Sequence, residues 1–221
     1  MSLPDPPLLL ITDRRQARLP LADVMTAALA AGCRWVSVRE KDLATEAQAV
    51  LARQLAPIAR RFGAKLTLHG DAETARAAGL DGVHLPAGGD VAAARALLGA
   101  DALIGRSIHY VAEAAALDPG LFDYAVAGPA FPTASKPGYG PALGREGLAA
   151  LCAATPVPIV AIGGIAPDNA GEVMRAGVTG IAVMGGVMRA PDPAAEIERL
   201  TAALRAVADD RPAAANRTRA G

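Results

Sequence analysis

Polar side chains close three apolar runs of the sequence, and in each run they alternate with apolar residues. The three runs are WVSVREK with Ser37, Arg39 and Lys41, KLTLH with Thr67 and His69, and IGRSIH with Ser107 and His109. Successive side chains of a β-strand point to opposite faces, so each polar set shares one face. Imidazole, hydroxyl and cationic groups on one face can transfer a proton and hold an anion. The pattern predicts a ligand pocket at the ends of these strands.

Two polar residues do not follow the pattern. Arg106 falls on the apolar face of its run, which argues against a place in the pocket. His84 lies inside the short run GVHLP rather than after it, so we interpret it as a buried structural histidine.

Paired glycines close two later runs, AIGGI (161–165) and AVMGG (182–186), each just before a helical stretch. Glycine lets backbone N–H groups approach an anion, and helix N-termini carry partial positive charge. The two pairs therefore predict the binding of a small phosphate ester. The longest connection, 128–144, carries Thr133, Ser135 and Lys136 among turn-forming residues and could close over the ligand.

The elements that position these residues alternate regularly along the chain. Eight short β-branched runs each precede an Ala-rich helical stretch, and the runs are 8–12, 35–40, 65–69, 82–86, 103–109, 123–128, 158–164 and 180–186. Alternating strand–helix units imply a parallel sheet, and eight of them predict a single (β/α)8 TIM barrel over residues 1–208. A doubly wound sheet is the alternative, although no G-x-G-x-x-G turn follows the first run. We expect 209–221 to form a disordered tail.

Composition excludes several classes of protein. Lys plus Arg equals Asp plus Glu at 22 each, which argues against nucleic-acid or membrane-surface binding. Cys33 and Cys152 suggest neither a disulfide framework nor a zinc site. No apolar run is long enough to span a membrane, and the first residues lack the basic start of a signal peptide. We expect a cytoplasmic protein, and a homo-oligomer remains open.

Six segments together resemble the thiamin phosphate synthase/TenI superfamily of small barrels, from residue 8 to about residue 206. They are REKDL (39–43), DGVHLP (81–86), IGRSIH (104–109), GPAFPTASK (128–136), AIGGI (161–165) and GIAVM (180–184). The resemblance implies a small-molecule thiazole phosphate substrate and two possible activities.

The synthase branch joins a pyrimidine diphosphate to a thiazole phosphate with Mg²⁺. Its pattern has Asn-Asp after the third strand and an Asp soon after the fourth. This sequence has His69-Gly70 at the first place and Asp90 displaced by about one residue at the second, and Ser37 stands where synthases usually carry Gln. Because Mg²⁺ prefers carboxylates and phosphate oxygens, these departures should weaken such a site.

The TenI branch is similar to this chain at a Gly after the third strand, L-P-x-G after the fourth and G-R-S-[VI]-H at the fifth. Its thiazole tautomerases aromatise a carboxythiazole phosphate without a metal. The resemblance assigns the acid–base role to His109, with Ser107 orienting the ring or its carboxylate. His69 is the rival base.

PTASK and REKDL are closer to the synthase pattern, in which Thr133, Ser135 and Lys136 contact diphosphate. The chain therefore combines segments similar to both branches, and we favour a tautomerase that needs no cofactor. The alternatives are a Mg²⁺-dependent synthase and a non-catalytic ligand-binding regulator. We assign His109 as the catalytic residue, no residue as a metal ligand, and as substrate-binding residues Arg39, Lys41, His69, Ser107, Thr133, Ser135, Lys136, Gly163, Gly164, Met184, Gly185 and Gly186.

Overall fold

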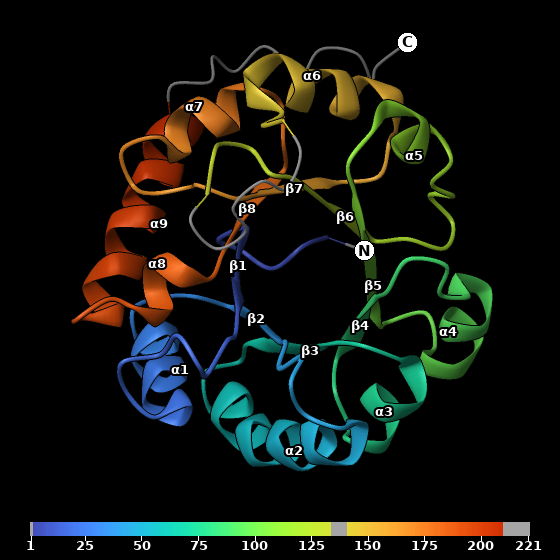
Figure 1. Ribbon diagram of the computed structural model, residues 1–221, viewed down its shortest axis with the longest axis vertical. Coiled ribbons are helices and arrows are strands. Elements are labelled where there is room, and N and C mark those ends of the chain that lie inside the picture. The colour runs from blue at the N-terminus through green and yellow to red at the C-terminus, as the bar shows by residue number, and fades with distance from the viewer. Residues whose placement is uncertain (1, 134–140, 210–221) are drawn as a thin grey trace, which may run out of the picture.

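The computed structural model describes residues 2–133 and 141–209, and in it eight parallel strands close into a barrel (Figure 1). The strands are β1 (Leu8–Ile11), β2 (Trp35–Val38), β3 (Lys65–His69), β4 (Gly82–Leu85), β5 (Leu103–Ile108), β6 (Tyr124–Ala127), β7 (Ile159–Ile162) and β8 (Gly180–Val183). Strand β1 pairs with both β2 and β8, which closes the sheet. The prediction of a (β/α)8 barrel is confirmed.

Helices surround the sheet and cover its outer face (Figure 1). They are α1 (Leu21–Ala30), α2 (Thr45–Arg61), α3 (Ala72–Ala77), α4 (Val91–Leu98), α5 (Val111–Ala115), α6 (Gly144–Ala154), α7 (Ala170–Arg175), α8 (Gly185–Met188) and α9 (Pro193–Asp209). The four-residue α8 follows β8 directly and was not expected from the sequence. Helix α9 includes Asp209, which was predicted to be the first residue of the tail 209–221, and residues 210–221 lie outside the described part of the chain. In 2–133 and 141–209, no helix has both the length and the apolarity needed to cross a membrane.

Alternation along each strand divides the core in two. One set of side chains packs between sheet and helices, as Val36, Val38, Leu66 and Leu68 do. The other set fills the lumen and consists of Leu9, Ile11, Trp35, Leu103, Tyr124, Val126, Val160 and Ala182. The ring of Tyr124 crosses the lumen so closely that a Cβ at Gly105 would lie 2.3 Å from Cζ of the tyrosine. Bulky side chains therefore fill the barrel below the strand ends.

Candidate active site

A cavity of about 1160 Å³ lies over the carboxyl ends of the strands, where enzymes of this architecture carry their active sites. The carboxyl end of every strand, or the turn after it, contributes to the wall, with Asp13, Arg39, His69, Pro86, His109, Gly128, Gly163 and Met184. Every predicted site residue within the described part of the chain lines it, namely Arg39, Lys41, His69, Ser107, His109, Thr133, Gly163, Gly164, Met184, Gly185 and Gly186. Ser135 and Lys136 lie outside the described residues.

The turn after β2 brings two cations to the cavity. Arg39 is partly buried, and burial lowers the pKa of its guanidinium. The positive charge of Arg39, followed by partial burial, lowers the pKa of Lys41. Within the described residues, neither cation forms an ion pair with a carboxylate. Arg39 Nη1 lies 3.9 Å from Sδ of Met184. These two cations can therefore receive an anionic ligand.

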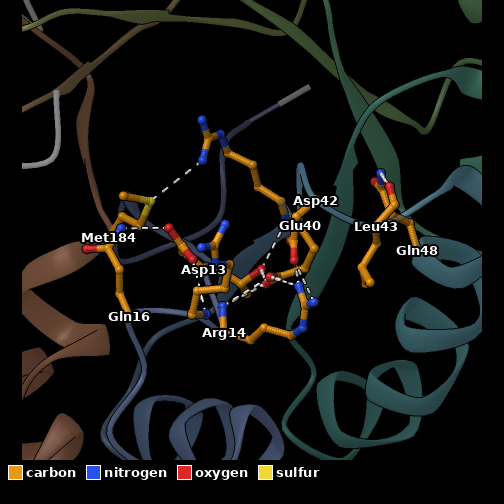
Figure 2. Close-up of polar contacts among 11 residues, drawn as sticks. Asp13, Arg14, Gln16, Glu40, Asp42, Leu43, Gln48 and Met184 are labelled. Carbon is orange, nitrogen blue, oxygen red and sulfur yellow. Dashed lines mark hydrogen bonds and ion pairs between the residues drawn. The ribbon is translucent and has the colours of Figure 1, made fainter.

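The buried carboxylate of Glu40 holds this turn in place. Its side chain accepts hydrogen bonds from Thr12 Oγ1 at 2.7 Å, from the backbone N–H of Arg14 and from the Arg14 guanidinium (Figure 2). Thr12 Oγ1 in turn accepts from the Arg39 N–H at 2.9 Å. The Arg14 guanidinium also makes two 2.7 Å bonds to Asp42. Glu40 thus joins the turns after β1 and β2 and fixes the backbone of Arg39.

All three histidines of the chain line the cavity. The rings of His69 and His84 stack with centroids 4.7 Å apart and planes 23° apart. His84 is 3% exposed, and its Nε2 lies 2.9 Å from Oγ of Ser107. Burial, followed by the charges of His69, Arg39 and Arg106, holds the pKa of His84 well below its ordinary value. His84 is buried, as the sequence predicted, but it also contacts a predicted ligand-binding group.

A hydrogen bond from the His109 ring to the Gly128 carbonyl helps to set the orientation of the ring. Nδ1 lies 2.8 Å from the carbonyl oxygen of Gly128, which can only accept. Nδ1 therefore carries the hydrogen, and in the neutral ring the lone pair is on Nε2. This tautomer suits a base that takes a proton through Nε2.

Arg106 lines the cavity, contrary to the expectation from its position in the strand. Its side chain leaves β5 on the helix-facing side, where the guanidinium carbon lies 5.6 Å from the ring centroid of Phe122. A long arginine can reach the cavity wall from the outer face of the sheet, which alternation alone does not reveal.

The paired glycines differ in the space around them. Gly163 and Gly164 have positive φ angles, 101° and 64°. A Cβ at Gly164 would lie 2.6 Å from the Pro132 carbonyl oxygen, and one at Gly163 would lie 2.9 Å from Pro129. Close packing against the segment after β6 therefore explains both glycines, apart from any ligand. At Gly186 a Cβ would meet only Glu196 Oε1, at 3.8 Å. Gly186 is thus the position where a phosphate-binding role can be tested without disturbing the packing.

The described residues do not fit a carboxylate-based magnesium site. In residues 2–133 and 141–209, no three His, Cys, Asp or Glu side chains gather closely enough to hold a metal ion. Asp71 caps α3 by accepting from the Thr74 N–H at 2.7 Å, and Asp90 caps α4 by accepting from the Ala93 N–H at 2.9 Å. Neither side chain lines the cavity. Both carboxylates therefore serve helix ends rather than a metal.

Sequence reasoning missed several cavity residues, which follow β1, β2, β5 and β8. They are Asp13, Arg15, Gln16, Asp42, Glu113 and Arg189. Asp13 accepts a 2.6 Å bond from the Gln16 amide, and Arg189, the residue after α8, contacts Gln16 through its guanidinium. Asp13 shares the lumen-facing alternation of Leu9 and Ile11, so the same pattern could have found it. Arg189 carries no such signal because α8 was not expected.

Comparison with known proteins gives consistent names. The family model "Thiamine monophosphate synthase" matches residues 8–187. A putative thiamine-phosphate synthase of Geobacter sulfurreducens is 42% identical over 199 residues, which cover 89% of this chain and 93% of the relative. The thiamine-phosphate synthase of Laribacter hongkongensis is 42% identical over 184 residues, covering 81% and 85%. The solved thiamine phosphate pyrophosphorylase from Pyrococcus furiosus superposes with a TM-score of 0.80 at 32% identity, covering 90% and 96%. These names favour the transferase alternative and give no specific support to the TenI branch.

Proposed function

This chain belongs to the thiamine monophosphate synthase/TenI family, and we propose that it is an enzyme of thiamin biosynthesis that acts on a thiazole phosphate. The step that the site geometry supports best is the metal-independent tautomerisation of a carboxythiazole phosphate. The observation that carries this proposal is the bond from His109 Nδ1–H to the Gly128 carbonyl, which leaves Nε2 as the basic nitrogen.

In the proposed reaction, Nε2 of His109 removes a proton from the ring carbon. The electron pair of that C–H bond enters the ring, and the exocyclic double bond shifts its pair to the exocyclic carbon. That carbon takes a proton from the imidazolium, so His109 returns to its starting state and the ring becomes aromatic. Arg39 and Lys41 would bind an anionic group of the substrate. Ser107 would hydrogen-bond the ring or its carboxylate.

Thiamin phosphate synthase is the second candidate. The names of the relatives favour it, as do the REKDL and PTASK segments. In this alternative Arg39 and Lys41 would hold the diphosphate of the pyrimidine substrate. Gly70 stands where the synthase pattern has an Asp, and the Asp90 carboxylate caps α4, so this candidate is placed second.

Two assays on one preparation of the wild-type chain separate the candidates. The first supplies the carboxythiazole phosphate tautomer with EDTA, and the second supplies pyrimidine diphosphate, thiazole phosphate and Mg²⁺. We expect tautomerisation at a rate that EDTA does not change, with little or no thiamin phosphate formed. Rapid Mg²⁺-dependent formation of thiamin phosphate without tautomerisation would establish the second candidate. Binding of thiazole phosphate with neither reaction would indicate a regulator.

A further inference from the structure

His84 lies in the wall of the cavity and is within hydrogen-bonding distance of a second cavity residue, Ser107. Its Nε2 is 2.9 Å from Oγ of Ser107. The two side chains come from neighbouring strands, with His84 in register with Gly105 and both residues on lumen-facing positions. Ser107 is exposed to the cavity, whereas His84 is 3% exposed. The serine is therefore the group that a ligand meets, and the histidine is its support.

The surroundings hold the imidazole still. The ring of His69 stacks on it at 4.7 Å, and the ring of Tyr124 lies 5.8 Å away at 38°. Because burial and nearby positive charges keep the pKa of His84 low, the ring is neutral around pH 7. A neutral imidazole carries one N–H and one lone pair, so its bond to Ser107 restricts the rotation of the hydroxyl.

We propose that His84 is a positioning residue that fixes the Ser107 hydroxyl in one orientation toward the substrate. This inference rests on the proposed function, in which Ser107 contacts the ring or carboxylate. His109 directly follows β5, two residues after Ser107, and both side chains line the cavity, so the fixed hydroxyl holds the substrate against the base. Without His84 the hydroxyl rotates freely, and part of its hydrogen bond to the substrate is lost.

A double-mutant cycle tests this role, because residues that act through one contact are not additive. The variants are Ser107→Ala, His84→Met and the double variant, with kcat and KM measured for each. One hydrogen bond contributes about 1 kcal/mol, so we expect each single variant to lower kcat on the order of five- to tenfold. The double variant should be no slower than Ser107→Ala. If the loss of kcat in the double variant equals the product of the two single losses, the proposal is overturned and His84 has a purely structural role.

Two further variants protect the test against a folding defect. His84→Gln can place an amide nitrogen near the Nε2 position, so we expect it to recover most of the wild-type kcat. If His84→Met does not fold, the cycle is completed with His84→Ala. Tyr124→Phe keeps the aromatic ring that lies 5.8 Å from the imidazole and should leave kcat unchanged. A similar loss of kcat in Tyr124→Phe and His84→Gln would indicate general disturbance of the core and also overturn the proposal.

The cycle is run on whichever of the two reactions the wild-type enzyme catalyses. An enzyme that makes thiamin phosphate would refute the tautomerase proposal, yet a non-additive cycle in that assay would still support the positioning role. If the enzyme is an active tautomerase and the two single losses of kcat simply multiply in the double variant, the positioning role is refuted and the tautomerase proposal stands.

Discussion

On the β1–β2 side of the cavity the polar groups are charged and bonded to one another, whereas on the β3–β5 side they surround a neutral imidazole. Glu40, Arg14 and Asp42 link two turns by short ionic hydrogen bonds. Across the cavity, His84 is buried, and within the part of the chain that the structure describes its ring is hydrogen-bonded to Ser107. The first side keeps positive charge in a fixed place, which suits the binding of an anion. The second places a neutral imidazole beside Ser107, which suits the proton transfer that we propose for His109.

Removing His109 tests this division with the largest expected effect. His109→Ala should lower the tautomerisation rate by about 10² to 10⁴, the usual contribution of a positioned acid–base group. Affinity for the substrate should change little, because the cations after β2 remain. The measurement is kcat and KM beside His69→Ala in the same assay. Full activity in His109→Ala with loss in His69→Ala would transfer the base to β3, and full activity in both would refute the mechanism.

The glycine pairs allow a second test, on folding and binding separately. Gly164→Ala forces an alanine into a left-handed conformation, which costs roughly 1–2 kcal/mol, and also brings Cβ against the Pro132 carbonyl. We expect the melting temperature to fall by about 5 °C or more. Gly186→Ala should keep the wild-type melting temperature and weaken binding of thiazole phosphate, measured by calorimetry. Unchanged affinity in Gly186→Ala would remove this position from the phosphate site.

Neutralising Glu40 should loosen the β1–β2 side. Glu40→Gln keeps the shape but removes the charge that Arg14 and Thr12 contact, at a cost of about 2 kcal/mol. For a chain of this length, that corresponds to a fall of about 4–8 °C in melting temperature. Asp42→Asn, whose ion pair is partly exposed, is the matched control and should lower it far less. Equal shifts in both variants would contradict the central role given to Glu40.

Acid should affect the β3–β5 side through His84. The unfolded chain binds a proton at this residue near pH 6.5, and the folded chain does not until the pH is much lower. Its contribution to stability is therefore complete above pH 6.5 and falls as the pH drops, by at most about 1.4 kcal/mol per pH unit. The free energy of unfolding of wild type and His84→Gln, measured at pH 5 and pH 7.5, isolates this contribution. The same pH dependence in both proteins would assign it to other groups.

Alkali should affect the β1–β2 side, with the smallest expected effect. Because the charge of Arg39 lowers the pKa of Lys41, Lys41 loses its proton at a lower pH than an ordinary lysine. Binding of thiazole phosphate should therefore weaken as the pH rises toward that lowered pKa. In Arg39→Gln the pKa of Lys41 rises, so the decline should begin at a higher pH. Titrations of affinity against pH for the two proteins make the comparison, and identical profiles would exclude Lys41 from the anion site.

The fold could be predicted from the sequence because each strand–helix unit repeats the same local pattern. Alternation within strands also placed Arg39, Lys41, Ser107 and His109 on the side that faces the cavity. The alternation of side chains along a strand predicts which face of the sheet a side chain points to. It does not predict how deeply the side chain is buried or which residues it contacts. For this reason His84 was interpreted as structural although it contacts Ser107, and Arg106 was doubted although its long side chain reaches the cavity.

The glycines show a second limit of sequence reasoning. A pair of glycines predicts that another group approaches the backbone closely, but it does not predict whether that group is a ligand or another part of the chain. At Gly163 and Gly164 the approaching group is the chain itself, the segment from Pro129 to Pro132. Such a contact joins residues more than thirty positions apart, and only the folded barrel brings them together.

The plugged lumen has a consequence for the order of events in catalysis. Trp35 and Tyr124 pack edge to face at 4.6 Å below the cavity, and both are fully buried. A small molecule therefore enters and leaves by the same mouth, the one framed by the turns after the strands. Product that has not left blocks the next substrate, so at high product concentration the enzyme should slow by simple competition. For either of the two proposed reactions, we therefore expect release of the product through this mouth to contribute to the turnover rate.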